Sequence, residues 1–425
     1  MNDNDDLTTD LSRTLQDQAH SMDGSSLGLA DVQGRARSIR RRRTATAVVG
    51  AAAAVALIVP TAALATHQID RSNEPLPATN SVSPTPSETT SPDRQPAPGV
   101  LDVSDLPTGP APRMDYVYDG RLHWPDGGVG DVNTRYEPDQ FVELVDGSIV
   151  WHTSDENGTG YVEIRDPDGG YDDPVRTDSG VSTNSAHSIA AWVTPTGQVT
   201  IFEGWASQPR PLGDPISGSD LRVGPITGSA DVAPGHPGPN CQESSCTVIV
   251  NVHDSPNQPW EVSESGSQPL TDGGYLDVND VSQSGLTIGF TKITDSSTCS
   301  KLLGGGEFQG FSTCQHQLSS FSPDGRLIQA LPSYFDGVGP GGIGMYDLEG
   351  TLLFERSSDE STQAFLSEAT WEDDTHLVAP MFQDGNWAIV RVASDGSMEY
   401  AVAPVKGPYD RSPFVLPTGG ALPGS

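Results

Sequence analysis

The sequence is poor in basic residues. It has 23 Lys and Arg against 57 Asp and Glu in 425 residues, a formal net charge of −34 at pH 7. Proteins that bind nucleic acid neutralise phosphates with clustered Lys and Arg, so this composition argues against nucleic acid as a partner. Aromatic residues make up only 7% and hydrophobic residues only 35% of the chain, whereas it contains 46 Gly and 35 Pro. Such a composition is typical of a β protein with many turns.

The sequence also lacks the common catalytic motifs. There is no G-x-S-x-G elbow, H-E-x-x-H pair, P-loop or kinase signature. No cofactor is predicted, and the sequence favours a non-catalytic role. A hydrolase assembled from distant loops stays open as an alternative.

One long apolar run is present, the stretch "TATAVVGAAAAVALIVPTAALA" at residues 44–65. Its 21 uncharged residues from Ala45 onward would form a helix of about 31 Å, which is long enough for a bilayer core. Six arginines precede the run, namely Arg35, Arg37, Arg40, Arg41, Arg42 and Arg43, and only Arg71 follows closely. The positive-inside bias therefore predicts a single-pass protein of the cell membrane, with a cytoplasmic N-terminus and an extracellular C-terminal region.

Two alternatives to a membrane anchor remain. Ala63-Leu64-Ala65 offers an A-x-A cleavage site, although the 43 residues before the apolar run exceed an ordinary signal-peptide n-region. The run could also be a buried helix of a soluble domain.

The segments on either side of the apolar run differ in charge. Residues 1–65 contain seven Arg and seven Asp, so the whole net charge lies beyond the run. Residues 1–43 form a short cytoplasmic arm in which Leu7, Leu11 and Leu15 share one face of a predicted helix. The arm, with "ADVQGRARSIRRRR" at its end, resembles the leaders of actinobacterial single-pass surface proteins. The resemblance implies a membrane topology, and it does not bear on activity.

Residues 66–112 are rich in Pro, Ser and Thr, with ten prolines and twelve Ser or Thr residues. A segment with almost no large apolar residues cannot bury a core, so we expect a disordered stalk. Residues 113–417 follow as the folded ectodomain, and residues 418–425 as a flexible tail.

The ectodomain sequence consists of short apolar runs of period two, separated by turn residues. Two-residue hairpin turns are expected at Asp146-Gly147, Thr196-Gly197, Asp324-Gly325, Glu349-Gly350 and Asp395-Gly396. About 300 residues of such hairpins predict either a β-propeller or stacked sandwiches. Blades of about 40 to 45 residues would give about seven, with six or eight as alternatives.

One hairpin carries a more specific pattern. The stretch "FSPDGRLI", residues 321–328, resembles the repeats of TolB-type and WD40-like β-propellers, and "VTPTGQV" and "VASDGSM" are degraded copies. The resemblance implies an all-β propeller for about residues 115–416. It carries over no functional residue.

All four cysteines lie beyond the apolar run, in what should be an oxidising compartment. Disulfides are therefore expected. The local pairs, Cys241 with Cys246 and Cys299 with Cys314, are favoured among the three connectivities because each brackets a hydrophilic loop. The second loop is expected to protrude and to offer a binding surface.

Four weaker patterns could mark functional sites. His236, Cys241, Cys246 and His316 can be combined into a zinc site, but no C-x₂-C pair exists. Residues 339–344, "GPGGIG", match G-x-G-x-x-G formally, yet they precede a strand pattern. Each is better explained as structural, so no metal or nucleotide site is predicted.

The other two patterns are acidic. "RDPDGGYDDP" holds four candidate calcium ligands in a predicted turn, namely Asp166, Asp168, Asp172 and Asp173. "EATWEDDTH" places carboxylates beside an aromatic ring and a histidine, a combination suited to sugar binding or acid/base chemistry. Its members are Glu368, Trp371, Glu372, Asp373, Asp374 and His376.

These observations predict a membrane-anchored extracytoplasmic binding module that recognises a protein, a peptide or an envelope glycan. One alternative is a transmembrane sensor whose cytoplasmic arm engages a regulatory partner. The other is an extracellular glycan hydrolase or lyase.

The anchor and the cleaved signal differ in the N-terminus of the mature protein. If the apolar run is an anchor, mass spectrometry of the protein purified from membranes should find peptides from residues 1–43. An N-terminus at Thr66 would instead establish cleavage after Ala65.

Overall fold

The computed structural model describes residues 99–170, 173–204, 206–228, 241, 246–254, 257–304, 310–335 and 339–420. The predicted arm, the predicted membrane helix and residues 66–98 of the predicted stalk lie outside these ranges. Within them, no helix is both long and apolar enough to cross a membrane. Almost all regular structure there is antiparallel β, and the described helical element is a single 3₁₀ turn at Asp272–Gly274.

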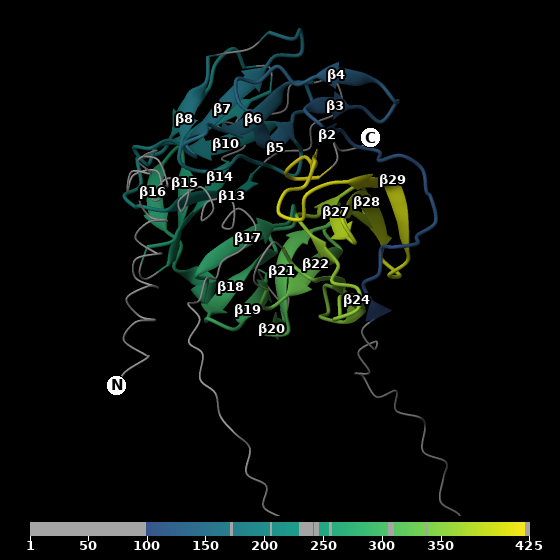
Figure 1. The fold of residues 1–425 in the computed structure, drawn as a ribbon. Coiled ribbons are helices and arrows are strands. Elements are labelled where there is room, and N and C mark those ends of the chain that lie inside the picture. Colours follow the sequence, from purple (N-terminus) through teal and green to yellow (C-terminus); the bar gives the residue numbers. More distant parts are fainter. Residues whose placement is uncertain are drawn as a thin grey trace, which may run out of the picture.

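The strands form seven sheets that follow one another around a ring (Figure 1). The chain is therefore an all-β propeller with seven blades, which is one of the two architectures that the sequence left open. Blade 1 contains β30 (Phe414–Val415), β2 (Tyr116–Tyr118), β3 (Arg121–His123) and β4 (Val129–Asp131). Blade 2 contains β5 (Pro138–Glu143), β6 (Ile149–Ser154), β7 (Gly160–Arg165) and β8 (Val175–Thr177). Blade 3 contains β9 (Ser182–Thr183), β10 (Ile189–Val193), β11 (Val199–Glu203) and β12 (Arg210–Leu212).

The other four blades repeat the same antiparallel meander. Blade 4 contains β13 (Leu221–Thr227), β14 (Thr247–Val252), β15 (Gln258–Ser263) and β16 (Gly266–Pro269). Blade 5 contains β17 (Asp277–Val281), β18 (Thr287–Ile293), β19 (Thr298–Leu303) and β20 (Ser312–Thr313). Blade 6 contains β21 (His316–Phe321), β22 (Leu327–Pro332), β23 (Gly342–Asp347) and β24 (Leu352–Ser357). Blade 7 contains β25 (Phe365–Leu366), β26 (Thr370–Trp371), β27 (His376–Gln383), β28 (Asn386–Ala393) and β29 (Met398–Lys406).

The hairpin turns lie where the sequence places them, but they are longer than two residues. At the first, Leu144 N–H donates to Ser148 O at 2.8 Å and Gly147 N–H donates to Leu144 O at 2.8 Å, which encloses three loop residues. Gly147 alone among these three has a positive φ, of 85°. Only the last loop position thus needs the left-handed conformation, and glycine adopts it without strain.

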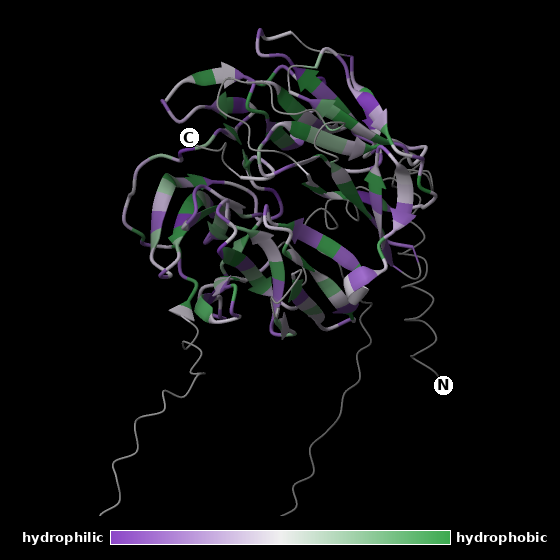
Figure 2. Cartoon of the chain, turned by 180° about the vertical axis from the view of Figure 1, so that it is seen from behind, coloured by the Kyte–Doolittle hydropathy of each residue, from purple (hydrophilic) through white to green (hydrophobic). Residues whose placement is uncertain are grey.

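The core is divided among the seven blade interfaces. Each neighbouring pair of blades encloses its own cluster of buried apolar side chains. Figure 2 shows these apolar residues along the strands and hydrophilic residues at many of the turns. Because every blade is covered on both faces, strands such as β10 are buried at all five positions.

The ring closes in blade 1, where strands from the two ends of the described chain meet. β30 pairs antiparallel with β2, with Val415 opposite Val117 and Phe414 opposite Tyr118. The Phe414 ring is 2% exposed and stacks on Tyr118 with centroids 5.1 Å apart. Two residues therefore supply the innermost strand of a blade whose other strands begin about 300 residues earlier in the chain.

Residues 99–113 run along the outside of blades 6 and 7, and we call them the strap. β1 (Gly99–Val100) pairs parallel with β24, and Leu101 and Val103 are buried in the cluster between these two blades. Further along, Gly109 N–H donates to Tyr400 O at 2.9 Å. The stalk was expected to extend to residue 112, whereas residues 99–112 pack against the propeller.

Both favoured cysteine pairs are bonded in the structure, Cys241 to Cys246 and Cys299 to Cys314. The described part of the loop between the second pair is the outer hairpin of blade 5, because β20 pairs with β19, and residues 305–309 of the expected protrusion lie outside the described residues. Ser300 lies opposite Thr313 and Lys301 opposite Ser312 in this hairpin. The disulfide thus ties the edge of a blade.

Ring closure can be tested at Phe414. Phe414→Ala should lower the free energy of unfolding by about 3–5 kcal/mol, because it removes a buried ring from the closing strand. Chemical denaturation measures the change. Tyr409→Ala is the matched control, since Tyr409 is 62% exposed and should change stability little. Equal effects of the two substitutions would contradict the proposed role of Phe414 in closure.

Candidate functional site: the central channel

The first strands of the blades surround a central channel of about 720 Å³. Blades 2 to 7 contribute to its wall, including Gln140 from blade 2, and residues 417–419, which follow β30, complete it. One end of the channel is formed by the turns that leave these inner strands, among them residues 183–187, 281–283 and 372–374. We call this end the turn-side mouth.

Polar contacts join each blade to the next along the channel. From blade 7 to blade 1, Leu416 N–H donates to Glu368 Oε1 at 2.9 Å, and from blade 1 to blade 2, Thr418 N–H donates to Phe141 O at 2.7 Å. The remaining five contacts are Val181 N–H to Gln140 Oε1 at 3.3 Å, the Asn184–Ile226 bridge, Asn251 Nδ2 to Val278 O at 2.9 Å, Phe321 N–H to Asp280 Oδ2 at 2.8 Å, and Trp371 Nε1 to Ser320 Oγ at 3.0 Å. These contacts satisfy groups at the inner edges of the sheets, where the neighbouring strand belongs to another blade.

Two of these contacts use carboxylates whose pKa is raised. Desolvation raises the pKa of Asp280 to about 6, although the Phe321 and Val281 N–H groups oppose the shift. Desolvation likewise raises the pKa of Glu368 to about 7, opposed by the Leu416 N–H. Both side chains therefore act in holding blades together.

Asp277 lines the channel near the start of the inner strand of blade 5. It is 5% exposed, and its Oδ2 lies 2.8 Å from Nε2 of His253 in blade 4. Its Oδ1 is buried without a hydrogen-bond partner. A buried unpaired oxygen of this kind is uncommon in folded proteins, where most such atoms find a partner.

The turn-side mouth at blade 7 contains a buried ion pair between Glu372 and Arg391. Arg391 Nη2 donates to Glu372 Oε1 at 2.7 Å, and its Nε contacts the other oxygen. The same guanidinium donates to the strap carbonyls of Pro110 and Ala111, both at 3.1 Å. The hydrogen bonds that Arg391 donates to Glu372 raise the pKa of Arg391, so the guanidinium stays charged.

This arrangement accounts for the acidic pattern that the sequence singled out at residues 368–376. Glu372 is engaged by Arg391, and Trp371 is buried with its Nε1 on Ser320. Asp373 accepts from His376 Nδ1 at 2.9 Å and from Arg113 Nη1 at 3.1 Å. The structure brings these residues together at the mouth, but it uses most of them to attach the turn and the strap. Asp374 is exposed there.

The other sequence candidates are separated or occupied. Cys241 and Cys246 form a disulfide, which corrects the zinc hypothesis, and His236 lies outside the described residues. His316 is buried, with Nδ1 2.8 Å from the Tyr346 hydroxyl. No set of three metal-ligating side chains occurs among the described residues.

The remaining two motifs lie in inter-strand segments. Residues 339–341 lead into β23 and residues 342–344 are its first three residues, which fits the structural interpretation of "GPGGIG". Asp166 and Asp168 belong to the turn after β7, where Gly169 N–H donates to Asp166 O at 2.9 Å. Asp173 follows this turn, and Asp172 is outside the described residues.

Sequence reasoning missed two acidic residues between blades 1 and 2, the buried Asp115 and the half-buried Glu143. Burial raises the pKa of Asp115 to about 7, and the charge of Asp126 adds to the effect. Burial also raises the pKa of Glu143 to about 8, with a further contribution from Asp115. Asp115 Oδ2 has no hydrogen-bond partner. No local pattern in the sequence distinguishes these residues from the many solvated carboxylates.

No known protein family and no curated protein matches the chain. Among solved structures it is similar to YCF48 bound to D1 peptide, with 13% identity, a TM-score of 0.40, and coverage of 70% of this chain and 86% of that chain. It is also similar to the β-propeller domain of Myceliophteria thermophila Cps50 (Swd1), with 10% identity, a TM-score of 0.40, and coverage of 65% and 89%. A third similar structure is the propeller domain of the Trilobed protease from Pyrococcus furiosus, with 9% identity, a TM-score of 0.39, and coverage of 63% and 85%. These are distant likenesses, and the fold assignment rests on the strand pairing described above.

The raised pKa values predict how stability depends on pH. Asp115, Glu143, Asp280 and Glu368 all bind a proton more tightly in the folded than in the unfolded chain, where their pKa is about 4. Protonation of these four carboxyl groups therefore adds to the free energy of unfolding at low pH, and this contribution is lost as pH rises through about 6 to 8. The melting temperature should rise by several degrees between about pH 9 and about pH 5.5.

The double variant Asp115→Asn/Glu143→Gln should flatten the dependence of melting temperature on pH. The control is Asp410→Asn, which should leave this dependence unchanged because Asp410 is exposed. Differential scanning calorimetry across the pH range measures the slope. If the double variant has the same slope as the parent protein, the buried pair is not its source.

Proposed function

We propose that this protein is a non-catalytic binding module, held outside the cell membrane by the predicted helix at residues 44–65, and that the central channel is its recognition site. The observation that carries the proposal is the channel itself. Its volume of about 720 Å³ lies within the range of small-molecule sites, and residues of blades 2 to 7 and of the segment after β30 converge on it. A protein segment or a peptide is the ligand class we favour.

The chemistry of the wall supports recognition. It combines amides, hydroxyls and carboxylates with apolar side chains such as Phe290 and Leu331. Contacts at all seven blade boundaries hold these groups in place, so little ordering is required when a ligand binds. The carboxylates that would be needed for acid/base chemistry near Trp371 are engaged in holding the turn, the strap and the neighbouring blade.

Two features support an extracytoplasmic location for the propeller. Both described disulfides are of the kind that persists in oxidising compartments. The six arginines within residues 35–43 favour a cytoplasmic N-terminus. The stalk would then hold the propeller away from the membrane surface.

One observation favours the second candidate, a transmembrane sensor. The strap connects the stalk directly to the turn-side mouth, because Arg113 N–H donates to Glu372 Oε1 at 2.8 Å and its guanidinium contacts Asp373. A ligand that moved this mouth would therefore act on the segment leading to the membrane. In that case the arm at residues 1–43 would engage a cytoplasmic partner.

The channel can be tested by blocking its mouth. Ser185 and Gln283 line the channel and are exposed, so Ser185→Trp/Gln283→Trp should fill the opening without disturbing the core. Asn157→Trp is the matched control, since Asn157 is exposed in a turn away from the channel. The full-length chain is panned against a random hexapeptide library in mild detergent, and enriched peptides are measured by fluorescence anisotropy.

We expect the blocked variant to lose at least tenfold in affinity and the Asn157 variant to bind like the parent protein. Peptides that bind the blocked variant equally well would show that recognition occurs elsewhere. Failure of the library to enrich any peptide over the blocked variant would argue against peptide recognition by the channel.

A further inference from the structure

The wall of the channel carries much more negative than positive charge. Six of its lining residues are carboxylates, and one is an arginine. The carboxylates are Asp277, Asp280, Glu368, Glu372, Asp373 and Asp374, and the arginine is Arg222. The chain as a whole carries a net charge of −34, so the field around the channel attracts cations.

Most of these carboxylates already have partners within the protein. Glu372 is paired with Arg391, and Asp373 with Arg113 and His376. Asp280 and Glu368 accept backbone N–H groups of the next blade. Asp277 differs from these four, because one of its carboxylate oxygens is buried with no donor.

The surroundings of Asp277 explain why this oxygen stays unpaired. His253 Nε2 contacts Oδ2 at 2.8 Å, and so it fixes one side of the carboxylate. The nearby Asn251 amide uses both of its groups on Val278, donating to the carbonyl at 2.9 Å and accepting from the N–H at 3.0 Å. Leaving a buried acceptor unpaired is costly. A donor supplied from outside would remove this cost.

We infer that the channel receives a cationic group, the guanidinium or ammonium of a basic peptide, and that Asp277 is its principal acceptor. The inference rests on the proposed role of the channel and names the chemistry of its ligand. Oδ1 is covered in the free protein, so the carboxylate turns about the Cβ–Cγ bond as the donor arrives, and the contact of Oδ2 with His253 rearranges with it. Asp374, exposed at the turn-side mouth, attracts the same charge at longer range.

The experiment measures binding of three labelled peptides to the purified full-length chain in mild detergent. The peptides are tetra-arginine, tetra-serine and tetra-glutamate, and fluorescence anisotropy gives each affinity. Tetra-arginine should bind at least tenfold more tightly than tetra-serine, tetra-glutamate should bind most weakly, and added salt should weaken tetra-arginine binding.

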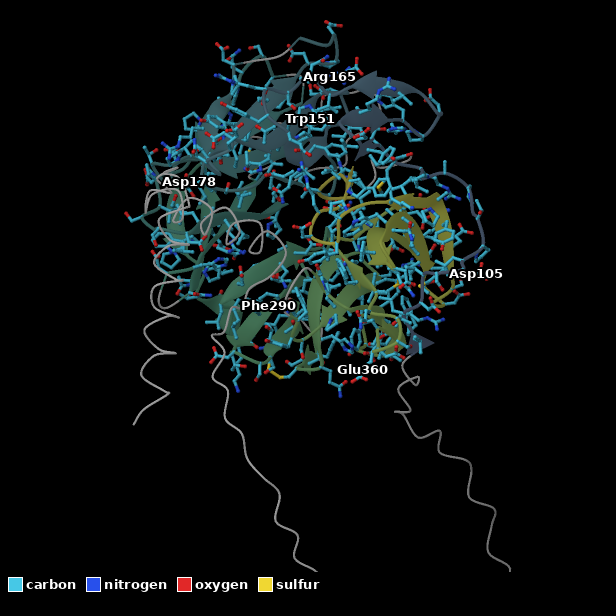
Figure 3. All side chains as sticks on the ribbon, viewed as in Figure 1. Asp105, Trp151, Arg165, Asp178, Phe290 and Glu360 are labelled. Carbon is cyan, nitrogen blue, oxygen red and sulfur yellow. A yellow bond between two sulfur atoms is a disulfide. The ribbon has the colours of Figure 1, made fainter. Side chains whose placement is uncertain are left out.

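Three variants identify the acceptor. Asp277→Asn keeps the size of the side chain and should weaken tetra-arginine binding by about tenfold, or about 1.4 kcal/mol. Asp374→Asn should weaken it by about two- to threefold, since its charge is exposed to solvent. Glu360→Gln removes the same charge at the periphery of the ring, on an exposed residue, and should have no effect (Figure 3). Unchanged near-ultraviolet circular dichroism verifies that each variant is folded.

Equal losses from Asp277→Asn and Glu360→Gln would overturn the inference, because binding would then reflect only the overall charge. Tetra-arginine binding no tighter than tetra-serine would overturn it as well. Asp277→Asn could fail to fold, in which case Asp374→Asn provides the test. If Asp374→Asn then weakens tetra-arginine binding no more than Glu360→Gln does, the inference is overturned. Hexapeptides without basic residues that bind the parent protein but not Ser185→Trp/Gln283→Trp would refute the cationic ligand and leave the proposed function intact.

Discussion

Ring closure is the constraint on which the rest of this structure depends. Seven blades can cover one another only if the last packs against the first, and the two ends of the described chain are joined in blade 1 by the pairing of Phe414 and Val415 with β2. Without it, the cluster between blades 7 and 1 would be exposed along with an unpaired strand edge. Closure also produces the channel, because the inner strands surround a common axis only in the complete ring.

The closed ring explains why polar groups gather at its centre. Apolar side chains fill the space between adjacent sheets, but the inner edge of each sheet presents backbone groups that need partners. Amide and carboxyl side chains of Gln140, Asn251, Asp280 and Glu368 supply them across the blade boundaries. A channel built in this way is polar for structural reasons, so only groups left without a structural partner, above all Asp277, point to a ligand.

Sequence patterns predicted the elements that depend on neighbouring residues and missed those that depend on distant ones. Alternating apolar residues and a glycine in each turn are local signals, and they revealed the hairpins, whereas the number of blades was left between six and eight. Phe414 and Val415 lie between prolines and carry no sign of a partner about 300 residues away. Leu101 and Val103 lie in a proline-rich stretch whose composition predicts a stalk. They are nevertheless buried, because the adjacent blade edges are apolar. Asp277 and Asp280 resemble solvated acids until the ring places them against other blades.

The strap links this ring to the segment that we expect to reach the membrane. Tension on the chain before Gly99 would act first on the pairing of β1 with β24 and on the buried Leu101 and Val103. It would next meet the hydrogen bonds from Tyr400 and Arg391, and only then β2, whose pairing closes the ring. Blades 6 and 7 thus separate the closing strand from the stalk. The same path passes the turn-side mouth at Glu372 and Asp373, so the contacts that protect ring closure also connect the channel to the stalk.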